Sequence, residues 1–89
     1  MISCRCIVEG RVQGVGFRYF TQRNARQMGV RGWVRNLVGG DVEIRVEGGR
    51  EAVRGFLDRI RQGPAYGRVE NLRVEETPAE GFDGFSIEV

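Results

Sequence analysis

The sequence predicts a small α+β sandwich of the ferredoxin-like, split β-α-β type, in which an antiparallel sheet carries two helices on one face. Stretches of β-forming residues and two stretches of helical periodicity follow one another in the order β-α-β-β-α-β, with a short extra strand near the C-terminus. A length of 89 residues leaves room for one hydrophobic core of modest size. We therefore expect residues 1–89 to form a single domain.

The first predicted strand covers residues 2–9. Its alternation places Cys4 and Cys6 on the same face, with Cα atoms about 6.6 Å apart, so a disulfide between them would be strained. We expect two buried thiols in a reducing compartment. The chain has no His and no further Cys, so a transition-metal site would depend on carboxylates alone. We expect neither a metal nor another cofactor.

A helix and a β-hairpin come next. Apolar residues recur at helical spacing over residues 17–28, before a glycine of the kind that ends helices. Residues 32–37 predict a strand, and a glycine turn at 38–40 leads into residues 41–47, where apolar and charged side chains alternate. This pattern is typical of a hairpin with one face in water.

The remaining segments complete the fold. An apolar helical stripe covers residues 50–62 and stops at a Gly-Pro pair. Residues 69–75 predict a further strand, and the terminal residues 85–89 can pair along a sheet edge.

The sheet face opposite the helices is predicted to be charged. Side chains of both signs would lie there, and we interpret them as a solvated surface with pairs of opposite charge across strands, rather than as a binding site. This face would carry Arg5, Arg35, Glu43, Arg45 and Glu47.

Charge and hydropathy exclude several classes of function. The net charge is only +2 and the arginines are scattered, so no nucleic-acid-binding arm is present. No apolar run approaches the length of a membrane span, and the N-terminus lacks the pattern of a secretory signal. We expect a cytoplasmic monomer that contacts neither nucleic acid nor membrane.

The loop between the first strand and the first helix carries the chemistry. Three glycines occur within residues 10–16, and the loop leads directly into the helix. The first turn of a helix exposes N–H groups without internal partners, which favour an anion. Gly16 at the expected N-cap leaves those donors free, whereas Ser or Asp would use them. Arg18 opposes the helix dipole at this place, and this suggests a bound anion.

The run GRVQGVGFR, followed by GWVRN, resembles the signature of the acylphosphatase family, and the likeness extends over essentially the whole chain. The resemblance implies the same sandwich fold and the hydrolysis of acylphosphates to a carboxylate and inorganic phosphate. In that family the arginine that closes the first motif binds the substrate phosphate, and the asparagine that closes the second orients the attacking water. These positions match Arg18 and Asn36. The positions that match the phosphate cradle, acting mainly through backbone N–H groups, are Gln13, Gly14, Val15, Gly16, Phe17 and Arg18.

The absence of His agrees with this chemistry. An acylphosphate expels a stable carboxylate that needs no general acid, and phosphoryl transfer requires mainly positioning and charge neutralisation. Two alternatives remain at this point. One is an RNA- or anion-binding module of the same fold, although its aromatic motif would lie on a central strand. The other is an accessory domain for a carbamoyl-transfer enzyme, whereas this chain starts with Met and is expected to be complete.

Overall fold

The computed structural model describes all 89 residues. Both helices have the predicted bounds, and every strand ends within two residues of its prediction. The elements in chain order are β1 Ile2–Arg11, α1 Phe17–Met28, β2 Arg31–Asn36, β3 Val42–Gly48, α2 Arg50–Gln62, β4 Arg68–Glu76 and β5 Phe85–Ile87.

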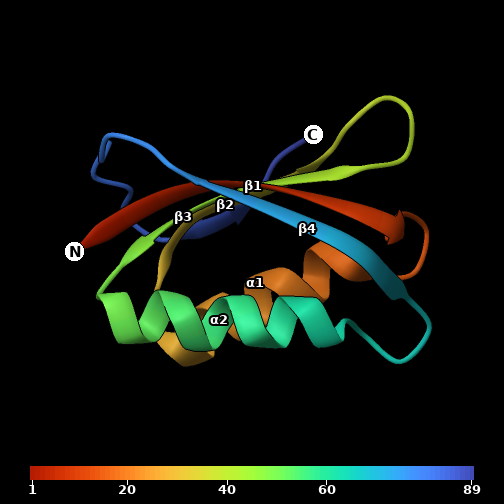
Figure 1. Cartoon of the computed structure of the whole chain (residues 1–89), viewed down its shortest axis with the longest axis horizontal. Helices are drawn as coiled ribbons and strands as arrows, with labels where there is room; N and C mark the ends of the chain where they lie inside the picture. The colour runs from red at the N-terminus through yellow and green to blue at the C-terminus, as the bar shows by residue number, and fades with distance from the viewer.

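The sheet has the strand order β4-β1-β3-β2-β5, and both helices cover one of its faces (Figure 1). Neighbours among β1 to β4 are antiparallel, as predicted. The last strand departs from this pattern because β5 pairs with β2 in parallel. The sheet is therefore mixed rather than wholly antiparallel, and the C-terminal segment lies beside the strand that ends at Asn36.

The hydrophobic core lies between the sheet and the two helices. The alternating residues of β1 and β3 that face the helices are almost completely buried, together with the apolar stripe of α2. Cys4 and Cys6 belong to this core and are free thiols, which confirms the prediction from strand parity. No helix is long and apolar enough to cross a membrane.

The outer face of the sheet differs from the prediction. Glu43 and Glu47 are buried rather than solvated, with 4 % and 0 % of their surface exposed. Glu43 is bracketed by the guanidinium groups of Arg5 and Arg35, so the predicted pairing of opposite charges across strands is present. Glu47 is covered by the loop of residues 77–84, whose backbone N–H groups bind its carboxylate. The prediction of a solvated face was therefore wrong for these two carboxylates, because two arginines cover Glu43 and a loop covers Glu47.

Candidate active site

The glycine loop brings the chain from the end of β1 to the start of α1. Gly14 and Gly16 have φ angles of 74° and 77°, in the left-handed region that glycine adopts without strain. Gly16 is the N-cap of α1 and makes no side-chain capping bond, and the first turn holds no acidic residue. The helix therefore starts without any internal group that neutralises its positive end.

The backbone donors of this loop are free. None of the N–H groups from Gly14 to Tyr19 donates a hydrogen bond within the chain, whereas the next amide, that of Phe20, bonds the carbonyl of Gly16 at 3.0 Å. Six consecutive unpaired donors at a helix N-terminus form a concentrated site for an anion.

Arg18 and Asn36 lie in the same hollow as the loop glycines, although 18 residues separate them in the sequence. The hollow has a volume of about 200 Å³. Arg18 forms no ion pair there, and its one polar contact within the chain runs from Nη1 to the carbonyl oxygen of Glu88 at 3.4 Å. Its charge is therefore available to a ligand. The lining residues are Val12, Gly14, Gly16, Phe17, Arg18, Tyr19, Asn36 and Ile87.

Asn36 is the last residue of β2, and the alternation of side chains along the strand puts it on the same face as Val34. Val34, two residues earlier, is fully buried in the core, so Asn36 faces the helix layer and the start of α1. Its side-chain Oδ1 is buried and has no hydrogen-bond partner. Buried acceptors are nearly always satisfied, so this orphan oxygen indicates a position where a water or ligand donor would be bound.

Two members of the predicted cradle lie outside the hollow. The side chain of Gln13 turns away from it, and Nε2 donates hydrogen bonds to the carbonyl oxygens of Leu37 and Asp41, each at 2.8 Å. Gln13 therefore fastens the loop to the β2–β3 hairpin. The half-buried Val15 packs against the hydrophobic core.

Three apolar wall residues were not predicted, namely Val12, Tyr19 and Ile87. Tyr19 is 71 % exposed at the rim, next to Arg18. Ile87 reaches the hollow only because β5 pairs with β2 in parallel. No local periodicity in the last five residues signals that pairing.

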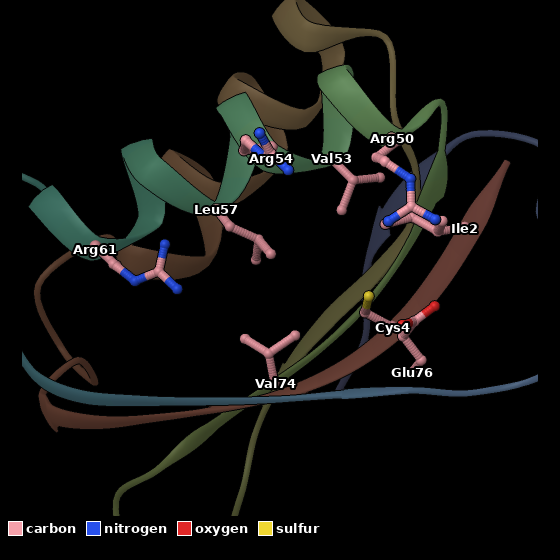
Figure 2. A pocket seen from close by; sticks show the side chains of 9 residues that line it. All are labelled: Ile2, Cys4, Arg50, Val53, Arg54, Leu57, Arg61, Val74 and Glu76. Atoms are coloured by element: carbon pink, nitrogen blue, oxygen red, sulfur yellow. The ribbon is translucent and has the colours of Figure 1, made fainter.

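A larger hollow of about 340 Å³ lies elsewhere, between α2 and the edge formed by β1 and β4 (Figure 2). Its apolar floor holds Cys4 and Val74, and arginines of α2 line one side. It shares no residue with the hollow at the glycine loop, and it contains no orphan buried polar atom. Of the two, only the hollow at the loop combines free donors, a free cation and an unsatisfied acceptor.

The acylphosphatase family model matches residues 4–87 of this chain. The chain belongs to the acylphosphatase family. The acylphosphatase of Thermotoga petrophila is 51 % identical over 87 residues, which cover 98 % of this chain and 97 % of the relative. The acylphosphatase of Bacillus licheniformis is 49 % identical over 88 residues, with 98 % of each chain covered. Such similarity over the whole length shows an acylphosphatase hydrolase, and the family implies a small-molecule acylphosphate as substrate.

Solved structures agree with this membership. The crystal structure of the Bacillus subtilis acylphosphatase superposes with a TM-score of 0.97 at 42 % identity, and each chain is covered completely. Full-length HypF, solved in a phosphate- and nucleotide-bound form, contains a region that covers all of this chain with a TM-score of 0.90 at 31 % identity. That region is 12 % of the HypF chain, so the acylphosphatase fold also occurs inside larger proteins.

Proposed function

We propose that the hollow at the start of α1 is the active site of the acylphosphatase reaction. In this proposal the loop of residues 13–18 and the guanidinium of Arg18 bind the phosphoryl group, and Asn36 positions the attacking water. Inorganic phosphate, the product, binds at the same place as a competitive inhibitor. The observation that carries the proposal is the juxtaposition of free loop amides, an unpaired Arg18 and the orphan Oδ1 of Asn36.

The phosphate subsite is supported by electrostatics. Unpaired N–H groups from Gly14 to Tyr19, the positive end of the α1 dipole and the Arg18 guanidinium all favour a dianion. An arginine fork matches the geometry of phosphate oxygens and keeps its charge at every relevant pH. Of the predicted cradle, we assign the backbone of Gly14 to Arg18 to phosphate binding, while the side chain of Gln13 holds the loop in place.

The water subsite is supported by the unsatisfied oxygen of Asn36. Oδ1 is a hydrogen-bond acceptor, and a rotation of the side chain would bring this buried oxygen to a water in the hollow, so that a lone pair of that water faces phosphorus. Asn36 and Arg18 line the same hollow, and this supports a water held next to the phosphoryl group. Holding the nucleophile close and in line is the larger part of what phosphoryl transfer requires.

In this mechanism no side chain of the protein acts as an acid or a base. The water oxygen forms a bond to phosphorus while the bond between phosphorus and the acyl oxygen breaks. The electron pair of that bond leaves with the carboxylate, and the proton of the water passes to a phosphoryl oxygen. Arg18 and the loop amides stabilise the charge on the equatorial oxygens in the transition state.

Two alanine variants test the two roles separately. Arg18→Ala removes a contact with both substrate and transition state, so KM should rise and kcat should fall. Asn36→Ala should chiefly lower kcat while the affinity for phosphate stays near normal. Suitable controls are Arg23→Ala, which removes an exposed side chain without a hydrogen bond on the same helix, and Asn71→Ala on the distant strand β4. Normal phosphate affinity in Arg18→Ala would refute the subsite.

We also propose a domain organisation, an oligomeric state and a cellular compartment for the protein. The groups that we assign to the phosphate and to the water all line one hollow of a single chain, so no second copy is needed to complete it, and residues 1–89 should act as a single acylphosphatase domain and as a monomer. Two free, buried thiols fit the reducing conditions of the cytoplasm. Specific activity should therefore be independent of protein concentration, and sedimentation should give the mass of one chain. A dissociating dimer with concentration-dependent activity would contradict this part.

A further inference from the structure

We propose that Glu47 is a positioning residue for the phosphate subsite, acting through the loop of residues 77–84 and the strand β5 that follows it. The inference rests on the proposed role of Arg18. Glu47 does not line the hollow and cannot touch a ligand there. Glu47 would act indirectly, because its own buried carboxylate holds the C-terminal segment against the sheet.

The carboxylate of Glu47 is the centre of a convergent set of donors. The hydroxyl of Ser3 donates to Oε2 at 3.0 Å, and the N–H of Glu80 donates to the same oxygen. The N–H groups of Gly81 and Phe82 donate to Oε1 at 3.0 and 3.3 Å. Three successive amides of one loop thus surround a single buried anion, an arrangement known for anion-binding nests.

No cation neutralises this charge directly. The nearby guanidinium of Arg45 makes no ion pair with Glu47. Its Nη1 lies 3.6 Å from the carboxylate of Glu80, its Nη2 donates to the hydroxyls of Thr77 at 3.0 Å and of Ser3 at 3.2 Å, and its Nε is buried without a partner. Its Cζ also lies 5.4 Å from the ring centroid of Phe82. Hydrogen bonds from the loop are therefore the main compensation for burying Glu47, and the loop in turn depends on Glu47 for its conformation. Gly81 has a φ of 80°, which allows its N–H to turn toward the carboxylate.

The loop leads directly into the wall of the hollow. It turns back at one end of the sheet and continues as β5 beside β2 (Figure 1). At the start of β5 the N–H of Gly32 bonds the carbonyl of Gly84 at 2.7 Å, and at its end the N–H of Glu88 bonds the carbonyl of Val34 at 2.8 Å.

Two groups of this segment reach the site. Ile87 lines the hollow, and the carbonyl oxygen of Glu88 accepts from Arg18 Nη1. Because β5 has only three residues, its pairing with β2 is short, and the preceding loop must hold it in register. The hydrogen bonds between Glu47 and the loop therefore help to fix the carbonyl oxygen of Glu88, which accepts from Arg18.

The test compares two buried carboxylates of the same strand. Glu47→Gln replaces one accepting oxygen by an NH₂ group, which would face the four donors that now bind the carboxylate. Glu43→Gln makes the same change at a carboxylate that binds the side chains of Arg5 and Arg35 and no loop. Both variants should unfold at lower temperature. Only Glu47→Gln should weaken phosphate binding, by about fivefold, and raise KM with little change in kcat. Amide exchange of β5 should become faster in this variant alone.

A second pair of variants covers the case in which Glu47→Gln fails to fold. Gly81→Ala and Gly29→Ala both introduce a side chain at a positive φ, near 80° and 74°, and neither new Cβ meets another atom. The strain is comparable, but only Gly81 belongs to the loop that binds Glu47. If Glu47 acts through this loop, phosphate binding should be weaker in Gly81→Ala alone.

The outcomes separate this inference from the proposed function. Equal phosphate affinity in Glu47→Gln and Glu43→Gln, or in the two glycine variants, would overturn the positioning role even if Arg18→Ala loses phosphate. Normal phosphate binding by Arg18→Ala would instead refute the subsite on which the inference depends.

Discussion

The side-chain amide of Gln13 lies 2.8 Å from the carbonyl oxygen of Leu37 and ties the glycine loop to the end of the strand that carries Asn36. The subsites that we propose for the phosphate and for the water belong to segments that are distant in the chain. Gln13 links those segments directly. Its amide also donates to the carbonyl oxygen of Asp41, on the other side of the hairpin turn.

Gln13→Ala should therefore lower kcat/KM although the side chain does not line the hollow. Two hydrogen bonds of about 1 kcal/mol each are lost, about 2 kcal/mol together, so the decrease should reach at most about thirtyfold. The control is Gln62→Ala at the exposed end of α2. Steady-state kinetics with one acylphosphate measure both variants. An unchanged kcat/KM in Gln13→Ala would show that the loop keeps its place without the link.

The features that sequence could predict are those with a local signal. The bounds of α1 follow from glycines at both of its ends, and the facing of Asn36 follows from strand parity with Val34. The same parity placed Cys4 and Cys6 in the core. In each case a short segment carries enough pattern to fix the geometry.

The features that escaped prediction depend on contacts between distant segments. Alternation along β3 is the same whether Glu47 faces water or a covering loop, and residues 77–84 have no periodicity that signals a cover. The parallel pairing that brings Ile87 to the hollow likewise has no local signature. The turn of Gln13 toward Leu37 depends on the hairpin, which lies 24 residues further along the chain.

Inorganic phosphate should stabilise the folded chain by binding at the start of α1. At ten times the dissociation constant, mass action adds about 1.4 kcal/mol, which raises the Tm of a domain of this size by about 6–11 °C. Thermal unfolding at increasing phosphate measures the shift, with chloride at matched ionic strength as the reference. The shift should disappear in Arg18→Ala and persist in Arg23→Ala, and an equal shift in both variants would mean that phosphate binds elsewhere.

The two thiols should be inert in the folded protein. Burial raises the pKa of Cys6 to about 12, and burial together with the charge of Glu76 raises the pKa of Cys4. Since the thiolate is the reactive form, a disulfide reagent at pH 8 should modify neither residue until denaturant is added. Ala65→Cys, on an exposed loop, provides a reactive control. Rapid labelling of the native wild type would show that the core around β1 opens.

The two buried carboxylates, Glu43 and Glu47, make the stability of the fold depend on pH at the acid end. Burial alone would raise the pKa of Glu43 and of Glu47, but hydrogen bonds outweigh it. Arg35 and Arg5 donate to Glu43, and the Glu80 N–H, the Ser3 hydroxyl and two further amides donate to Glu47, so both pKa values lie below the ordinary range. A depressed pKa in the folded state adds stability that is present above the unfolded value, about 4.3, and is lost as the pH falls through the folded value.

Activity should consequently depend on pH only through folding at the acid end. The chain has no His, and neither a guanidinium nor a side-chain amide changes its charge in this range, so kcat should be nearly flat from roughly pH 5.5 to 7.5. The measurement is a kcat profile with benzoyl phosphate, corrected for spontaneous hydrolysis, beside a stability profile from urea unfolding. Stability should fall below about pH 4.3, and this fall should be smaller in Glu47→Gln because that variant has one titrating carboxylate fewer. A bell-shaped kcat profile centred between pH 5.5 and 7.5, with the protein fully folded, would require a carboxylate of raised pKa as general base. Asn36 would then have to orient a water that the carboxylate deprotonates.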